Sequence, residues 1–90
     1  MRERVIIRIR GRVQGVFFRH SARIHAEQLG IRGSAANLND GLLEIIAEGD
    51  RASLEELIAW CRTGPPLARV DEIAITWEQP SGVFKRFTIL

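Results

Sequence analysis

The chain is poor in several residue types, and each shortage excludes a class of protein. It has a single cysteine, Cys61, so neither an internal disulfide framework nor a multi-cysteine metal site is possible. No apolar run approaches the ~18 residues of a membrane-spanning helix. The arginine-rich start, MRERVIIRIRG, lacks the apolar segment of a signal peptide. We therefore expect a cytoplasmic protein without a membrane partner.

The length and composition predict a single globular domain, residues 1–90. Each half of so short a chain would bury too little surface to fold separately. Hydrophobic residues make up 46% and charged residues 27% of the chain, which is near the globular average and argues against intrinsic disorder. Nothing in the composition demands more than a monomer.

The basic residues are concentrated in the first third of the chain. Residues 1–32 hold eight of the twelve arginines and only two acidic residues, Glu3 and Glu27, whereas the rest of the chain is net acidic. A positive segment can attract nucleic acid, an acidic membrane or a small phosphate or carboxylate. In the alternative, four of these arginines line the solvent face of an edge strand. These four are Arg2, Arg4, Arg8 and Arg10.

Apolar spacing predicts the element order β-α-β-β-α-β with a short further strand at the end. Alternation predicts strands near residues 5–9, 31–38, 43–47, 73–77 and 87–89. Helical spacing predicts helices over 18–29 and 54–61, the second starting at a capping box, Ser53–Glu56. Asn39-Asp40-Gly41 predicts a tight hairpin turn. The order is that of the ferredoxin-like split βαβ sandwich, an α+β fold with two helices on one face of an antiparallel sheet.

Several common chemistries are absent from the sequence. His20 and His25 are five residues apart, about 140° around a helix, so they share no face for a metal ion. The single lysine, Lys85, stands in no phosphate-binding P-loop, and no serine has the glycine spacing of a hydrolase nucleophile. Cys61 lies on the apolar stripe of its helix, which favours a core thiol over a nucleophile. We expect no metal and no cofactor.

One loop remains, Gly11-Arg-Val-Gln-Gly-Val-Phe-Phe-Arg19, between the first strand and the first helix. Its two glycines let the backbone curl so that several N–H groups point inward and form an anion-binding nest. The following helix adds its free amides and a partial positive charge. Arg19 in the first helical turn is unfavourable unless it faces an anion, and its guanidinium can hold two phosphate oxygens. The alternative is a glycine-rich turn with an ordinary surface arginine.

This loop closely resembles the signature loop of the acylphosphatases. The resemblance continues through Leu29-Gly30-Ile31 and Gly33 to Asn37, followed by Asp40-Gly41-Leu42-Leu43-Glu44. It covers about residues 5–60, with a weaker echo over 87–90, and the family fold is the same split βαβ sandwich. One departure is Ser34-Ala35, where the family often has Trp-Val after this glycine. We expect that change to affect substrate fit more than chemistry.

The resemblance implies the role of each site residue. Arg19 matches the catalytic arginine that holds the phosphoryl group, and Asn37 matches the asparagine that positions the attacking water. The matching residues whose backbone amides cradle the phosphate are Gly15, Val16, Phe17 and Phe18. The implied reaction is metal-independent hydrolysis of small acyl phosphates, with inorganic phosphate as product and inhibitor. Since a carboxylate leaving group has a conjugate acid of pKa ~4, no general acid is required.

Two questions stay open beside this interpretation. A ferredoxin-like RNA-binding domain would suit the basic N-terminal third, but the candidate central strands hold no aromatic residue on which bases could stack, so we expect no nucleic-acid partner. A non-catalytic anion-sensing module would use the same loop, but it has no need of Asn37.

The two phenylalanines of the loop have different expected places. Phe18 is expected in the core, whereas Phe17 either forms the rim of the site or anchors the loop.

Overall fold

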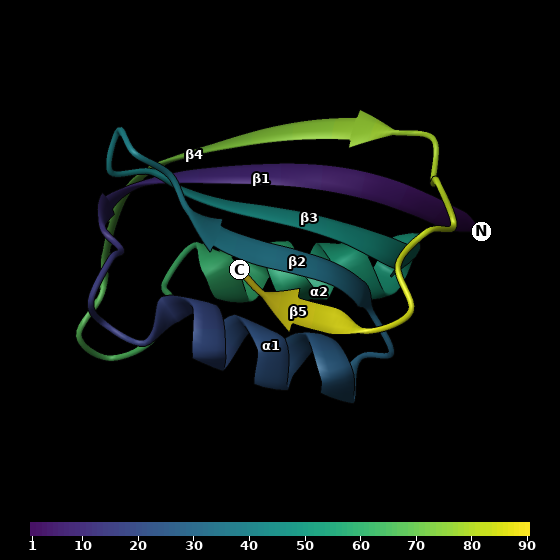
Figure 1. The fold of residues 1–90 in the computed structure, drawn as a ribbon, viewed down its shortest axis with the longest axis horizontal. Coiled ribbons are helices and arrows are strands. Elements are labelled where there is room, and N and C mark those ends of the chain that lie inside the picture. The colour runs from purple at the N-terminus through teal and green to yellow at the C-terminus, as the bar shows by residue number, and fades with distance from the viewer.

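The computed structural model describes residues 1–90 as a two-layer sandwich, in which two helices cover one face of a five-stranded sheet (Figure 1). The elements are β1 (Arg2–Arg12), α1 (Phe18–Gln28), β2 (Arg32–Asn37), β3 (Leu43–Asp50), α2 (Arg51–Cys61), β4 (Arg69–Glu78) and β5 (Phe87–Ile89). The strand order in the sheet is β4-β1-β3-β2-β5. The predicted split βαβ arrangement with a terminal strand is confirmed. Neither helix has the length and apolar character needed to cross a membrane.

The last strand makes the sheet mixed. The pairs β1–β3, β1–β4 and β2–β3 are antiparallel, but β5 pairs with β2 in parallel. The prediction of an antiparallel sheet is therefore wrong for β5. The reason is the connection over residues 79–86, which crosses from β4 at one edge to the other edge at one end of the sheet, on the right of Figure 1. Because β2 also starts at that end, β5 runs alongside it in the same direction.

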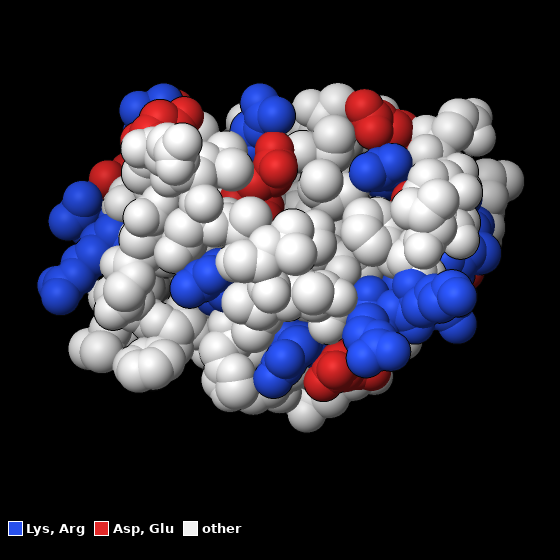
Figure 2. All heavy atoms as spheres, in the orientation of Figure 1, with Lys and Arg blue, Asp and Glu red and all other residues white.

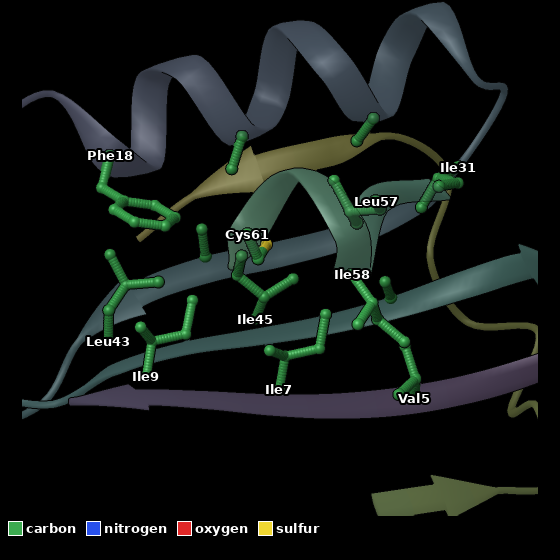
Figure 3. Close-up of a cluster of buried hydrophobic side chains, with 14 of the residues drawn as sticks. Val5, Ile7, Ile9, Phe18, Ile31, Leu43, Ile45, Leu57, Ile58 and Cys61 are labelled. Atoms are coloured by element: carbon green, nitrogen blue, oxygen red, sulfur yellow. The ribbon is translucent and has the colours of Figure 1, made fainter. Parts of the chain in front are cut away.

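The hydrophobic core lies between the sheet and the helices. Val5, Ile7 and Ile9 alternate along β1 and point towards the helical layer, where they meet side chains from β3 and α2 (Figure 3). The Phe18 side chain of α1 packs into the same cluster and is 1% exposed. Phe18 thus occupies the core position expected for it, and this fixes the start of α1 next to the loop that precedes it.

Three arginines of β1, at positions 4, 8 and 10, lie on the other, open face of the sheet and pair with acidic residues of neighbouring strands. Arg8 Nε lies 2.9 Å from Glu44, and Arg10 Nε lies 3.9 Å from Glu72. Since β1 is an interior strand, the expectation of an edge strand is wrong, although the arginines do face solvent. Acidic groups stand beside basic ones along the upper edge of Figure 2. The positive charge of these three arginines is therefore largely compensated on this face of the sheet.

A buried carboxylate holds the β4–β5 crossover onto this open face. Glu48 of β3 is 1% exposed and accepts three hydrogen bonds, from Ser81 N (2.8 Å), Ser81 Oγ (2.7 Å) and Gly82 N (3.0 Å). Arg4 Nε lies 3.7 Å from the same carboxylate. The crossover is thus fastened about midway between the two edges that it connects.

Two boundaries differ from the sequence prediction. Gly11 and Arg12 belong to β1 rather than to a loop, because the strand continues through a register shift after Arg10. Gly11 has φ +140° there, and a Cβ would lie 2.1 Å from the Arg69 carbonyl oxygen, so no larger residue fits without a backbone shift. This register shift, a β-bulge, lets β1 remain paired with β4 up to Arg12, where the loop before α1 begins.

The helix α2 begins earlier than predicted. It starts at Arg51, directly after β3, with Asp50 as an N-cap that makes no side-chain capping bond, so the capping box at 53–56 does not start the helix. Arg51 Nη1 donates to Glu3 at 3.0 Å, and its guanidinium lies 3.6 Å from the centre of the Trp77 ring. These partners come from β1 and β4, so tertiary contacts fix this helical turn in place of local capping.

Candidate active site

The loop between β1 and α1 and the end of β2 lie at one end of the sheet, on the left of Figure 1, and β5 runs towards the same end. They enclose a cavity of about 390 Å³. Its lining residues are Val13, Gly15, Phe17, Phe18, Arg19, His20, Asn37 and Ile89. The structure therefore brings together Arg19, Asn37 and three of the four predicted loop residues. The fourth, Val16, is 3% exposed and anchors the loop in the core.

The backbone of this loop presents donors that the chain itself does not use. Gly15 has φ +75° and Phe17 has φ +63°, so two left-handed residues stand two positions apart. The amide N–H groups of Gly15, Val16 and Phe17 donate to no acceptor in the protein. Those of residues 18–20 open α1 and have no partner within the helix. Consecutive free amides of this kind form an anion-binding concavity, as the sequence predicts.

Arg19 projects from the first turn of α1 into the cavity. Its Nη1 donates to the backbone oxygen of Leu90 at 2.6 Å, which holds the guanidinium in place. No aspartate or glutamate side chain lies within ion-pair distance, and none lines the cavity. Arg19 therefore has no acidic side chain as a partner, and its one hydrogen bond within the protein is to the Leu90 oxygen.

Asn37 is the last residue of β2 and lines the same cavity. It is half-buried, and its Oδ1 is fully buried with no hydrogen-bond partner. A buried acceptor without a partner costs about 1–3 kcal/mol. Because the two ends of the amide exchange by a 180° rotation without changing its shape, Asn37 can offer either a donor or an acceptor to the cavity.

Gln14 joins the two halves of the site, a role that the sequence analysis missed. Its Nε2 donates to the carbonyl oxygens of Leu38 (2.9 Å) and Leu42 (3.1 Å). The loop that carries the free amides is thereby tied to the turn that follows Asn37. The only signal for this role in the sequence is a polar residue between Val13 and Gly15 in the signature loop.

The position of Arg19 also depends on packing behind it. The Phe18 ring meets Trp60 edge to face, with ring centres 5.2 Å apart. A Cβ on Gly64 would lie 2.5 Å from the Phe18 ring, so this glycine leaves the space that the ring occupies. His20 is exposed on α1, as expected of a helix surface residue, and also lines the cavity, whereas His25 packs against Trp60 with ring centres 4.4 Å apart.

Other reactive groups lie away from this cavity. Burial raises the pKa of the Cys61 thiol to about 12, with the nearby Arg62 acting weakly in the opposite direction, so Cys61 is a core residue and not a nucleophile. Nowhere do three histidine, cysteine, aspartate or glutamate side chains gather into a group that could hold a metal ion.

Comparison with known proteins gives a consistent picture. The acylphosphatase family model matches residues 5–89. An acylphosphatase of Methylococcus capsulatus is 47% identical over 88 residues, covering 98% of this chain and 96% of the relative. One from Thermococcus kodakarensis is 49% identical over 82 residues, covering 91% and 90%. The crystal structure of acylphosphatase from Bacillus subtilis superposes with a TM-score of 0.91 at 33% identity, covering 100% of this chain and 99% of that one.

These relatives match over nearly their whole length, so they share both the fold and the segments that form the cavity. The family model includes the loop of free amides, Arg19 and Asn37 within the residues that it matches. The chain belongs to the acylphosphatase family, whose reaction is the hydrolysis of acyl phosphates to a carboxylate and inorganic phosphate.

Proposed function

We propose that Arg19, the loop amides and Asn37 perform this hydrolysis without a metal ion. The observation that carries the proposal is their convergence on one cavity that contains no acidic side chain. A phosphoryl group carries its charge on the non-bridging oxygens, and these are what free amides and a guanidinium bind. The predicted roles of Gly15, Val16, Phe17 and Phe18 are thus assigned to their backbone N–H groups.

Arg19 and the amides would stabilise charge on the phosphoryl oxygens in the transition state. The Leu90 oxygen accepts from one N–H of the Arg19 guanidinium. The remaining N–H donors of this planar group can hold phosphoryl oxygens. Donors that are already oriented need no reorganisation during the reaction. Phosphoryl transfer depends largely on such positioning and charge stabilisation, so this site is chemically sufficient despite its small number of side chains.

Asn37 would position the attacking water. Its neutral amide can hold the water oxygen in line with the scissile bond without taking its proton. The water oxygen forms the new bond to phosphorus, the bond from phosphorus to the acyl oxygen breaks, and the carboxylate leaves with the electron pair. A phosphoryl oxygen of the substrate takes the proton, so no proton transfer is assigned to His20.

The remaining expectations follow from the same site. Inorganic phosphate presents the same oxygens as the substrate and is expected to inhibit competitively as the product. One hydrophobic core shared by the helices and the sheet supports the proposal of a single domain, and we expect it to act as a monomer. A lone, buried, reduced Cys61 is compatible with the cytoplasm.

The test is hydrolysis of acetyl phosphate by the purified protein with excess EDTA present. We expect full turnover under chelation, with inhibition by inorganic phosphate that raises KM and leaves kcat unchanged. Activity that is lost on chelation and restored by a divalent cation would overturn metal independence. Noncompetitive inhibition would place phosphate outside the cavity.

A further inference from the structure

Phe17 combines two unfavourable features at the mouth of the cavity. It is the only residue other than glycine with a positive φ, at φ 63° and ψ 25°. The left-handed region is a genuine outlier for a bulky side chain, whereas glycine adopts it freely. The curled backbone of the loop therefore explains the conformation but not the choice of phenylalanine.

The Phe17 side chain also gains little from burial. It is 74% exposed, while its neighbours Val16 and Phe18 are 3% and 1% exposed. An exposed phenyl ring contributes little to the core, so packing does not offset the backbone strain. Strained residues that are retained without internal compensation are concentrated at functional sites.

The cavity itself divides into a polar and an apolar part. Arg19, Asn37 and the loop amides are assigned to the phosphoryl group, whereas the side chains of Val13, Phe17 and Ile89 are apolar. At about 390 Å³ the cavity falls in the range of small-molecule sites and exceeds what a phosphoryl group alone requires. In an acyl phosphate, the part that remains is the acyl group, which points away from the attacking water.

We propose that the Phe17 ring forms the acyl-binding rim of the site, so that the enzyme prefers acyl phosphates with apolar, and above all aromatic, acyl groups. The inference rests on the proposed function, since it places the phosphoryl group at Arg19 and the loop amides. Stacked or edge-to-face contact with an aromatic acyl group covers a ring that the chain leaves exposed. A charged or very small acyl group gains nothing from that contact.

The experiment compares benzoyl phosphate with acetyl phosphate in wild type, Phe17→Ala and Phe17→Gly. Phe17→Ala removes the ring and keeps a side chain at the strained φ, while Phe17→Gly removes both ring and strain. The matched control is Val83→Ala, which shortens an apolar side chain that is 70% exposed in the distant β4–β5 crossover. The inhibition constant for inorganic phosphate is measured for each protein.

We expect the ratio of kcat/KM for benzoyl phosphate to kcat/KM for acetyl phosphate to fall about tenfold in both Phe17 variants, mainly through the KM of benzoyl phosphate. An effect of the variants on the Phe17 backbone amide alters both substrates alike and cancels in that ratio, and the inhibition constant of phosphate reports its size. Val83→Ala should resemble wild type. Equal losses on both substrates, or no change in their ratio, would overturn the proposal while leaving the hydrolase activity intact. A wild-type protein that hydrolyses neither substrate would instead refute the proposed function.

Discussion

The two ends of the sheet carry the same kinds of donor for an anion, but only at one end does an acidic side chain of the protein accept from them. At the crossover end, two backbone N–H groups, a hydroxyl and an arginine surround the Glu48 carboxylate. At the site end, the amides of Gly15 to Phe17 have no acceptor within the protein, and no aspartate or glutamate side chain lines the cavity beside Arg19. Donors satisfied within the chain fasten a loop, whereas donors without an internal partner can bind a ligand.

The ionisation of Glu48 shows how strong such a set of donors is. Burial alone raises the pKa of this carboxyl, but the hydrogen bonds from Ser81 and Gly82 and the charge of Arg4 outweigh burial and hold the pKa below its usual value. A similar arrangement of amides and guanidinium at the other end should favour a phosphoryl group in its fully charged form.

The largest effect should come from removing the cation at the site end. Arg19→Gln should lower kcat/KM for acetyl phosphate by about 10³–10⁵, as for other arginines that stabilise a phosphoryl transition state. Arg19→Lys should recover little, because an ammonium group lacks the planar fork. Steady-state kinetics and a thermal melt decide the role: an Arg19→Gln protein that melts much earlier but keeps its turnover would make Arg19 structural.

Asn37→Ala separates water positioning from phosphate binding. We expect kcat to fall by about 10²–10³ while the inhibition constant of phosphate stays near wild type, since the loss affects the attacking water. If Asn37 only supports the turn that follows it, kcat should change little and stability should fall by roughly 1 kcal/mol. Kinetics and a urea midpoint on this one variant distinguish the two.

At the opposite end, Glu48→Gln should affect stability more than catalysis. The variant replaces a charged acceptor of three hydrogen bonds by a neutral amide that places an N–H group among donors. We expect the free energy of unfolding to fall by about 2–3 kcal/mol, with kcat within about twofold of wild type. Glu78→Gln is the control, because it removes the exposed partner of Arg4, at 3.8 Å, and should change stability by less than about 1 kcal/mol.

Comparing Glu48→Gln with wild type also tests how the stability of the protein depends on pH. Because the folded-state pKa of Glu48 lies below the usual 4.5, its contribution to stability is complete above pH 4.5 and is lost as the pH falls through the folded value. Urea midpoints from pH 6 downward should therefore fall more steeply for wild type than for Glu48→Gln. Parallel curves would show that the carboxylate is not the group that titrates.

The smallest effect is expected at Cys61. With a pKa of about 12, only about one thiol in 10⁴ is ionised at pH 8, and the side chain is fully buried. A thiol reagent added to the native protein should therefore react slowly and leave activity unchanged. Rapid labelling with loss of turnover would mean that α2 opens far more readily than its packing indicates.

The sequence predicts those features that depend on neighbouring residues. The alternation of Val5, Ile7 and Ile9 identifies β1, the turn at Asn39-Asp40-Gly41 identifies the hairpin, and the spacing of Phe18, Ala22 and Ala26 identifies the buried face of α1. The signature loop and Asn37 then locate the site, because their residues are specified by type as well as by spacing.

The features that the sequence did not predict depend on contacts between distant residues. The bond from Arg19 to Leu90 spans 71 positions, and those from Ser81 and Gly82 to Glu48 span 33 and 34. No periodicity encodes such pairs, and a local capping rule misplaced the start of α2 because Glu3 and Trp77 hold its first residue. The left-handed conformation of Phe17 was not predicted either, because the residue type alone favours another conformation there.

The contact between Arg19 and Leu90 also has a consequence for the entropy of binding. A free arginine side chain loses about 2 kcal/mol of rotamer entropy when it is fixed in one conformation. Because the Leu90 oxygen already restricts the guanidinium, part of that loss occurs during folding and not when the substrate binds. The parallel pairing of the three-residue strand β5 with β2 therefore trades stability of the fold for affinity at the site.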